Sequence, residues 1–266
     1  MRVQEIMDAK HPSIRENEYV TNARAMIRDF SLRILPVVNK DKKLVGILSR
    51  REIMTISSAI SPIDVKGVMT QPKQTSTLTD DAYEAVKQMI KLDEWYIPVL
   101  NSPDEKTYKG VLGLQNFIEA ILKTSPEKLS RPVSDSMCKD PLVICSPDDE
   151  VDDVWRLMQD RSFAGLPVTK GKKLIGIVTQ QDLLQSGRTF PGFEAEKGRF
   201  RAPSKISQIM KTGIVTVQPT VKVIRVAKVM VSKDIGRIPV TDEKGNLIGI
   251  VDREDVANLI VNERAK

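Results

Sequence analysis

The chain has 266 residues, of which 41% are hydrophobic and 29% charged, a composition typical of globular proteins rather than disordered or fibrous ones. This length predicts about two domains. One histidine and two cysteines argue against His-rich zinc sites, Ser-His-Asp triads and a disulfide framework, and indicate reduced thiols in a cytoplasmic protein.

No apolar run approaches the ~18 residues that span a bilayer, and charged residues among the first ten interrupt any signal-peptide core. A cytoplasmic location is therefore expected, with no membrane partner. The net charge of +6 favours anionic partners, such as nucleotides, nucleic acid or an acidic protein surface.

A fourfold internal repeat runs along the chain. Each copy contains a Pro-Val string, then a second apolar string with a glycine, and a methionine 29 or 30 residues before the proline. The Pro-Val strings are RILPVVN (33–39), WYIPVLN (95–101), AGLPVTK (164–170) and GRIPVTD (236–242). The methionines are Met7, Met69, Met137 and Met210, and the glycines are Gly46, Gly110, Gly176 and Gly249.

Each copy is predicted to run strand, helix, strand, strand, helix. First strands are expected at 141–147 and 213–219, and the spacing of apolar residues predicts a helix over 147–160. The proline predicts that its strand lies at an edge or entry position, and 50–60 is typical of the closing helix. Because a unit of ~60 residues is marginal alone, the copies are expected to pair.

This layout resembles the cystathionine-β-synthase (CBS) domain, a small regulatory module. The resemblance divides the chain into CBS repeats at 1–61, 62–124, 130–187 and 204–266, with a basic, aromatic insertion at 188–203. It implies an α/β (α+β) fold with the copies paired into two Bateman modules that form a disc. Archaeal stand-alone four-CBS proteins and the gamma subunit of AMP-activated protein kinase share this organisation.

The resemblance also implies a function. It indicates a non-catalytic regulatory protein that senses AMP, ADP, ATP or an S-adenosyl compound in clefts between paired copies and signals to a partner protein, with a homodimer as one assembly. With one histidine, no metal cluster and no Walker glycine loop, we expect no enzyme and no catalytic cofactor.

In the family, the second strand ends in Gly-h-h-Thr/Ser-x-x-Asp, where h is apolar. The Asp binds ribose hydroxyls, and the hydroxyl residue helps to hold phosphate at the helix start, where free N–H groups suit an anion. The same spacing is also typical of a capping box, which stabilises a helix start without any ligand. The corresponding pairs here are Ser49 and Glu52, Gly113 and Asn116, Thr179 and Asp182, and Asp252 and Asp255.

These pairs differ between copies. Copy two lacks both the hydroxyl and the negative charge, so its site is expected to be empty or altered, and Glu52 is longer than the usual Asp. The second half of the chain is therefore predicted to be better equipped to bind a nucleotide.

Residues before the Pro-Val strings add further candidates. The resemblance implies that Arg237, beside Ile238, and Arg33 reach phosphates, for which the planar guanidinium is suited; ordinary solvated arginines are the alternative. Gly165 and Leu166 could let an adenine ring lie against the backbone, or could simply pack. Trp95 and Tyr96 of copy two either plug its cleft or pack the domain interface.

Three other features complete the analysis. The stretch 186–205 supplies +3 of the net charge and carries phenylalanines, so a nucleic-acid-binding or scaffolding protein that uses 188–201 is the alternative function. Such binding would fall steeply with salt; packing of this stretch onto the disc is the other interpretation. Cys145 is expected to be a buried, inert thiol. The single His11 is expected in a surface turn, with a phosphate contact as the alternative.

Overall fold

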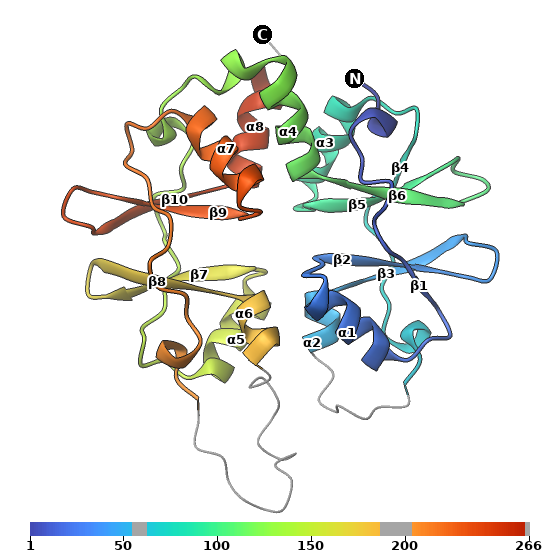
Figure 1. Ribbon diagram of the computed structural model, residues 1–266, viewed down its shortest axis with the longest axis horizontal. Coiled ribbons are helices and arrows are strands. Elements are labelled where there is room, and N and C mark those ends of the chain that lie inside the picture. Colours follow the sequence, from blue (N-terminus) through green and yellow to red (C-terminus); the bar gives the residue numbers. More distant parts are fainter. Residues whose placement is uncertain (55–62, 187–203, 264–266) are drawn as a thin grey trace, which may run out of the picture.

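The computed structural model describes residues 1–54, 63–186 and 204–263. Four copies of one α/β unit surround the centre of a disc (Figure 1). The sheets of copies one and two face each other in the first module, and those of copies three and four face each other in the second. Within the described residues, no helix is long and apolar enough to cross a membrane.

The elements repeat with small variations. Copy one contains β1 (Ile14–Arg15), α1 (Val20–Asp29), β2 (Ile34–Val38), β3 (Leu44–Ser49) and α2 (Arg50–Met54). Copy two contains β4 (Ser76–Thr77), α3 (Ala82–Lys91), β5 (Tyr96–Leu100), β6 (Tyr108–Gly113) and α4 (Leu114–Thr124). Copy three contains α5 (Val151–Asp160), β7 (Gly165–Lys170), β8 (Lys173–Thr179) and α6 (Gln180–Ser186). Copy four contains α7 (Val223–Ser232), β9 (Arg237–Thr241), β10 (Leu247–Asp252) and α8 (Arg253–Glu263).

The first strand is shorter than predicted in copies three and four, where it is a single bridge of Cys145 to Val168 or of Val217 to Val240. In copy one, the bond from the N–H of Glu16 to the Val38 carbonyl, at 3.0 Å, extends the ladder beyond β1. The corresponding residues of copies three and four are prolines, at 147 and 219, which have no N–H to donate.

The expectation that the proline lies in an edge strand is right for copies three and four and wrong for copies one and two. There the proline strand is the middle strand of three, in the orders β1-β2-β3 and β4-β5-β6. The structure tolerates this because β1 pairs only with Val37 and Val38. The nitrogen of Pro36 therefore lies beyond the end of β1, where β1 offers no acceptor for an N–H. The missing N–H of the proline thus costs the sheet no hydrogen bond.

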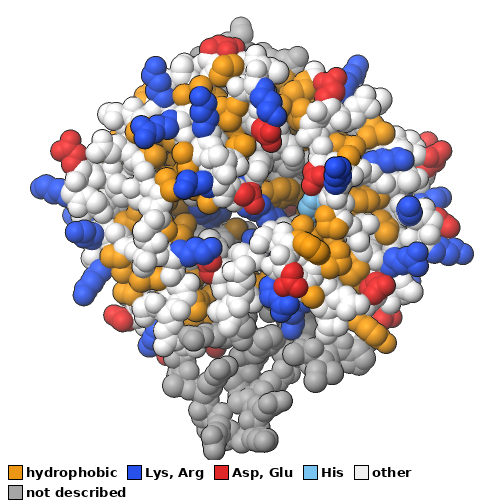
Figure 2. Space-filling view, viewed as in Figure 1, with side chains coloured by type: hydrophobic (Ala, Val, Ile, Leu, Met, Phe, Trp, Pro, Cys, Tyr) orange, Lys and Arg blue, Asp and Glu red, His pale blue; other side chains and the backbone are white. Residues whose placement is uncertain are grey.

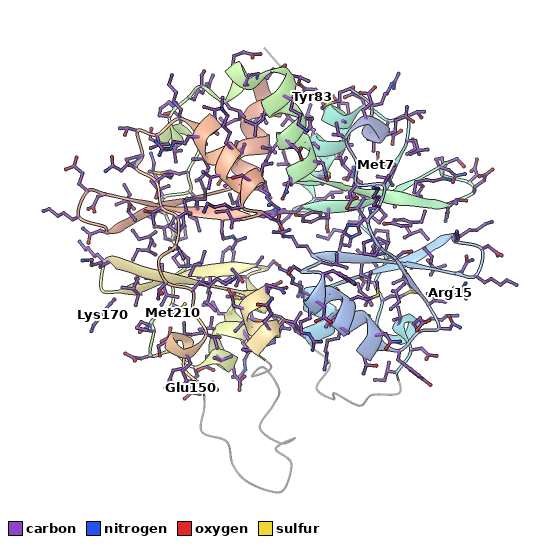
Figure 3. The ribbon with its side chains drawn as sticks, in the orientation of Figure 1. Met7, Arg15, Tyr83, Glu150, Lys170 and Met210 are labelled. Atoms are coloured by element: carbon purple, nitrogen blue, oxygen red, sulfur yellow. The ribbon has the colours of Figure 1, made fainter. Side chains whose placement is uncertain are left out.

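The segment that ends at each repeated methionine packs on the other copy of its module. These segments contain the 3-10 helices η1 (Val3–Glu5), η2 (Val65–Gly67), η4 (Val133–Asp135) and η6 (Ile206–Gln208). The N–H of Val3 donates to Asp80 of copy two at 3.0 Å, and that of Val65 donates to Glu18 of copy one at 2.8 Å. Figure 3 accordingly places Met7 beside copy two and Met210 beside copy three.

This exchange of methionine segments between the two copies of a module explains why each copy has a glycine in its second apolar strand. A Cβ at Gly46 would lie 2.7 Å from the sulfur of Met69, and one at Gly249 would lie 2.8 Å from that of Met137. Both distances are far below van der Waals contact, so only glycine fits where the segment of the paired copy crosses the strand.

Helices join the two modules. One hydrophobic core combines copies two and four, with Phe117 and Ile121 of α4 packed with Val256 and Ile260 of α8. A second core combines copies one and three. Facing sheets thus join the copies within a module, and helices join one module to the other, which directs one end of every sheet toward the disc centre (Figure 1).

Candidate functional site

Strand pairing brings the motif residues of each copy together. The residue two before the proline pairs with the residue three after the glycine, and the closing helix begins directly afterwards. The pairs are Ile34 with Ser49, Tyr96 with Gly113, Gly165 with Thr179, and Arg237 with Asp252. All four lie at the strand ends that point toward the disc centre (Figure 1).

In copy three, Thr179 and Asp182 form a capping box. The Asp182 carboxylate accepts hydrogen bonds from the Thr179 N–H at 2.9 Å and from its hydroxyl at 2.5 Å. The other carboxylate oxygen lies 2.8 Å from the ammonium of Lys211, which belongs to copy four. The side chain of Asp182 is only 4% exposed whereas that of Lys211 is 62% exposed, so Lys211 covers this carboxylate from the solvent side.

Copies one and two form the same cap with other residues. The Glu52 carboxylate accepts from the N–H of Ser49 at 2.7 Å and from its hydroxyl at 2.5 Å. The side-chain oxygen of Asn116 accepts from the N–H of Gly113 at 2.8 Å. The capping role that the spacing predicts is thus present, and copy two keeps it without a charge.

Copy four brings two carboxylates together. Asp255 accepts from the N–H of Asp252 at 2.9 Å, and Asp252 accepts from the N–H of Asp255 at 3.1 Å. Burial raises the pKa of Asp252, although the nearby Arg237 lowers it. Burial and the charge of Asp252 together raise the pKa of Asp255 to about 7. Two carboxyl groups so close together in a partly buried place favour a partner that neutralises or hydrogen-bonds them.

Arg237 reaches from copy four to both neighbouring copies. Its guanidinium donates to the Gly165 carbonyl of copy three and lies 5.6 Å from the ring centre of Trp95 in copy two. Desolvation lowers its pKa. Leu166 and Ile238 have almost fully buried side chains within the two cores, so only their backbone is available to a ligand.

Arg33 and Asp234 lie in a cluster at the disc centre that also contains Arg253. The Arg33 guanidinium is 3.2 Å from the Asp234 carboxylate and 5.7 Å from the ring centre of Tyr96. Arg253 is fully buried; it donates to Asp234 at 2.8 Å and to the Tyr96 hydroxyl at 2.7 Å. Burial acts to raise the pKa of Asp234, but these arginines outweigh it and lower that pKa.

Arg50 adds a further cation from copy one. Burial and then the charge of Arg33 lower the pKa of Arg50 to about 10. Its side chain donates to the Ser31 carbonyl at 2.6 Å, but its Nε, like the Nε of Arg253, is buried without a hydrogen-bond partner. Figure 2 shows that the face is hollowed near this centre, with basic and acidic side chains around the hollow.

Arg50 and Arg253 were not among the residues expected from sequence. Each directly follows the third residue after its repeat glycine, Ser49 in copy one and Asp252 in copy four. Their shared position in the repeat is the signal that could have identified them.

Trp95 and Tyr96 of copy two pack an interface between copies, which is the second of the two interpretations given above. The indole N–H of Trp95 donates to Glu254 of copy four at 3.1 Å. A Cβ at Gly236 would lie 3.0 Å from the same ring, so the indole fits closely against copy four. Burial raises the pKa of Glu254.

Three remaining expectations have different outcomes. His11 is not a surface turn residue, because its side chain is 12% exposed and its Nε2 lies 2.9 Å from the Ile34 carbonyl of copy one. The prediction of a buried thiol is confirmed for Cys145. Its burial raises the pKa of the thiol to about 12. The insertion at 188–203, on which both the packing interpretation and the alternative nucleic-acid-binding function rest, lies outside the described residues.

Comparison with known proteins places the chain in a family. The family model "CBS domain" matches residues 3–59, 133–188 and 206–262, which together exceed half of the chain. Copy two is outside these matches, although the structure gives it the same elements as copy one. Its Gly113 and Asn116 differ from the family motif at both positions.

Relatives extend the match to the full length. Protein MJ1225 of Methanocaldococcus jannaschii is 26% identical over 258 residues, covering 89% of this chain and 90% of its own. The crystal structure of MJ1225, described as that of a proposed archaeal homologue of g-AMPK, superposes with a TM-score of 0.86 and 24% identity over 98% of this chain and 100% of its own. A conserved protein from Pyrococcus horikoshii covers 98% of this chain and 100% of its own, with a TM-score of 0.67 and 23% identity. The chain is a tandem CBS-domain protein and belongs to the CBS domain family.

Proposed function

We propose that this chain is a non-catalytic regulatory protein that binds adenine nucleotides or S-adenosyl compounds at the disc centre and signals their presence to a partner protein. The description of MJ1225 as a proposed archaeal homologue of g-AMPK supports a role in adenine-nucleotide sensing. The same family also supports a cytoplasmic regulator without a catalytic centre.

The observation that carries the proposal is the arginine cluster. Arg33, Arg50 and Arg253 come from two modules, and two of their Nε groups are buried without a partner. Buried polar groups are nearly always hydrogen-bonded, and a guanidinium can hold phosphate oxygens in two places. A phosphate group at the disc centre can accept hydrogen bonds from Arg33, whose side chain is 27% exposed, and would offset the positive charge of the two buried arginines beside it.

The ends of the strands supply complementary groups for the rest of a nucleotide. Asp182 and Asp255 are carboxylates at helix starts, where they can accept hydrogen bonds from a ribose diol. Gly165 instead packs against Thr179, whose methyl carbon would lie 2.9 Å from a Cβ at this position, and its carbonyl orients the Arg237 guanidinium beside these carboxylates. For a ribose to reach Asp182 the ion pair with Lys211 has to open, and the exposure of Lys211 makes that inexpensive.

Isothermal titration calorimetry with AMP, ADP, ATP and S-adenosylmethionine tests the proposal. We compare the wild type with Asp182→Ala and Asp255→Ala, and with Asp81→Ala as a matched control. Asp81 also caps a helix, accepting from the N–H groups of Tyr83 at 2.9 Å and Glu84 at 3.2 Å, but it begins α3, away from the disc centre.

Binding that weakens at least tenfold in one of the two site variants and stays unchanged in Asp81→Ala supports the assignment. Equal affinity in all four proteins removes these carboxylates from the site. If the wild type binds none of the four ligands, the sensing function itself fails. Thermal unfolding of each variant checks that a loss of affinity is not a loss of fold.

A further inference from the structure

The first module contains a cavity at its outer rim, far from the arginine cluster. Its volume is about 370 Å³, within the range of small-molecule sites. It lies between β1, the turn that joins β2 to β3, and the start of β6 from copy two. Figure 3 shows Arg15 at this outer side. Val38 borders the cavity and lies at the outer end of β2, whereas Ile34 lies at the end that points toward the disc centre. Four residues of strand separate them, which places the cavity roughly 13 Å from the inner end of the strand.

The cavity is strongly basic. Arg15, Lys40, Lys42 and Lys109 line it, and no aspartate or glutamate does. Among the described residues, none of these four side chains forms an ion pair with a carboxylate. Four cations gathered around one concave surface repel each other, and a bound anion would remove that cost.

The walls of the cavity are well fixed. The N–H of Tyr108 donates to the Lys42 carbonyl at 3.0 Å, and the N–H of Leu44 donates to the Lys106 carbonyl at 2.9 Å, which ties the two hairpins together. Ile14 and Val38 are buried, and the ring of Tyr108 is half-buried beside them. A charged rim above apolar and aromatic walls suits an organic molecule that carries anionic groups.

The second module shows that the fold does not require this charge. Cys145 pairs with Val168 as Ile14 pairs with Val37, so Ser146 stands in the position of Arg15. The residue before the repeat glycine is Ile248 in copy four, where copy two has Lys109. The turn of copy three does keep two lysines, Lys170 and Lys172. The full basic set therefore belongs to the first module and not to both.

We propose that this outer cavity binds a phosphorylated small molecule with at least two anionic groups, at a site separate from the disc centre. The lysines and Arg15 hold the anionic groups, while Tyr108 and Ile14 contact its organic part. The proposal does not depend on whether the disc centre binds a nucleotide.

Fluorine NMR on protein labelled with 3-fluorotyrosine can observe the two sites separately. The chain has four tyrosines. Tyr108 lines the outer cavity, Tyr96 contacts Arg253 at the disc centre, and Tyr19 and Tyr83 lie at neither place. Inorganic pyrophosphate is the probe, added at constant ionic strength, and Tyr→Phe variants assign the signals.

The expected result is a saturable shift of the Tyr108 signal, with affinity reduced at least tenfold in Lys40→Ala/Lys109→Ala. The matched control, Lys170→Ala/Lys172→Ala, removes two lysines from the other module and leaves the shift unchanged. Lys40→Arg/Lys109→Arg keeps both charges and retains binding, which separates loss of charge from loss of fold.

A Tyr108 signal that pyrophosphate does not move would overturn the proposal. So would a shift that both alanine double variants reduce equally, because general attraction to a basic surface would then explain it. A shift confined to Tyr96 would place the anion at the disc centre and equally reject the outer site.

Discussion

The carboxylate of Asp234 in copy four lies 3.2 Å from the guanidinium of Arg33 in copy one, and the same oxygen accepts a hydrogen bond from Arg253 at 2.8 Å. One acidic side chain thus joins both modules across the disc centre. Removing its charge would leave Arg253, which is fully buried, without its ionic partner.

We therefore expect Asp234→Asn to lower the free energy of unfolding by about 2 kcal/mol, less than for a fully buried pair because Asp234 is itself 55% exposed. Urea denaturation at neutral pH measures the change. The control is Asp29→Asn, whose partner Arg28 is exposed and adjacent in the chain. Equal stability of the Asp234 variant and the wild type would show that the ion pairs contribute nothing.

Gly46→Ala tests the exchange of segments between copies. The added Cβ would meet the Met69 sulfur at 2.7 Å and the Thr70 carbonyl oxygen at 3.0 Å. Overpacking of this kind destabilises a protein by about 1–3 kcal/mol. Gly67→Ala is the control, because the nearest atom to its Cβ would be a methyl group of Ile63 at 3.4 Å. Denaturation midpoints that fall equally in both variants would contradict the close approach.

The raised pKa of Asp255 predicts a pH dependence of stability. Between its ordinary value of 3.8 and about 7, the folded protein binds more protons at this group than the unfolded chain does. The contribution of Asp255 to stability therefore falls as the pH rises through this window and stays constant above it. Asp255→Asn removes the ionisation, and its amide oxygen can still accept the bond from Asp252.

We expect the variant to lose less stability than the wild type between pH 4.5 and 7.5, by on the order of 1–2 kcal/mol after allowance for solvent exposure. Denaturation curves at several pH values measure this difference. Asp242→Asn is the control and should leave the pH profile nearly unchanged in this range, because hydrogen bonds from Asn246 lower the pKa of Asp242 from 3.8 and the group is then ionised in both the folded and the unfolded state above pH 4.5. Parallel pH profiles for Asp255→Asn and the wild type would reject the ionisation of this group as the cause.

Lys211→Met tests whether Asp182 is covered before ligand binds. If Asp182 receives a ribose, the ion pair at 2.8 Å has to break first, and removal of the ammonium should raise the affinity for adenosine about two- to fivefold. Adenosine is the probe in calorimetry because it has no phosphate for a lysine to contact. Lys205→Met, which breaks the exposed pair with Glu150, should leave the affinity unchanged. Weaker binding by Lys211→Met would mean that this lysine contacts the ligand instead.

Much of the fold followed from the repeat, because the Pro-Val and glycine strings mark two strands in every copy. The exchange of the methionine segments could not be predicted, since a segment that packs on its own copy or on the paired copy has the same period in the sequence. Arg253 was missed for a related reason. An arginine just after a helix cap is usual on an exposed first turn, and only the approach of Tyr96 and Asp234 from other elements makes it buried.

The exchanged segments also determine the smallest piece of this chain that can fold. A single repeat cut out at its sequence boundaries would lose the methionine segment of the paired copy, which covers Gly46 or its equivalent. Its own methionine segment would have no paired copy to pack on. Half of the chain, with two complete repeats, keeps every exchanged contact. Because the two hydrophobic cores join copies two and four and copies one and three, the two halves of the intact chain should nevertheless melt together as one cooperative unit.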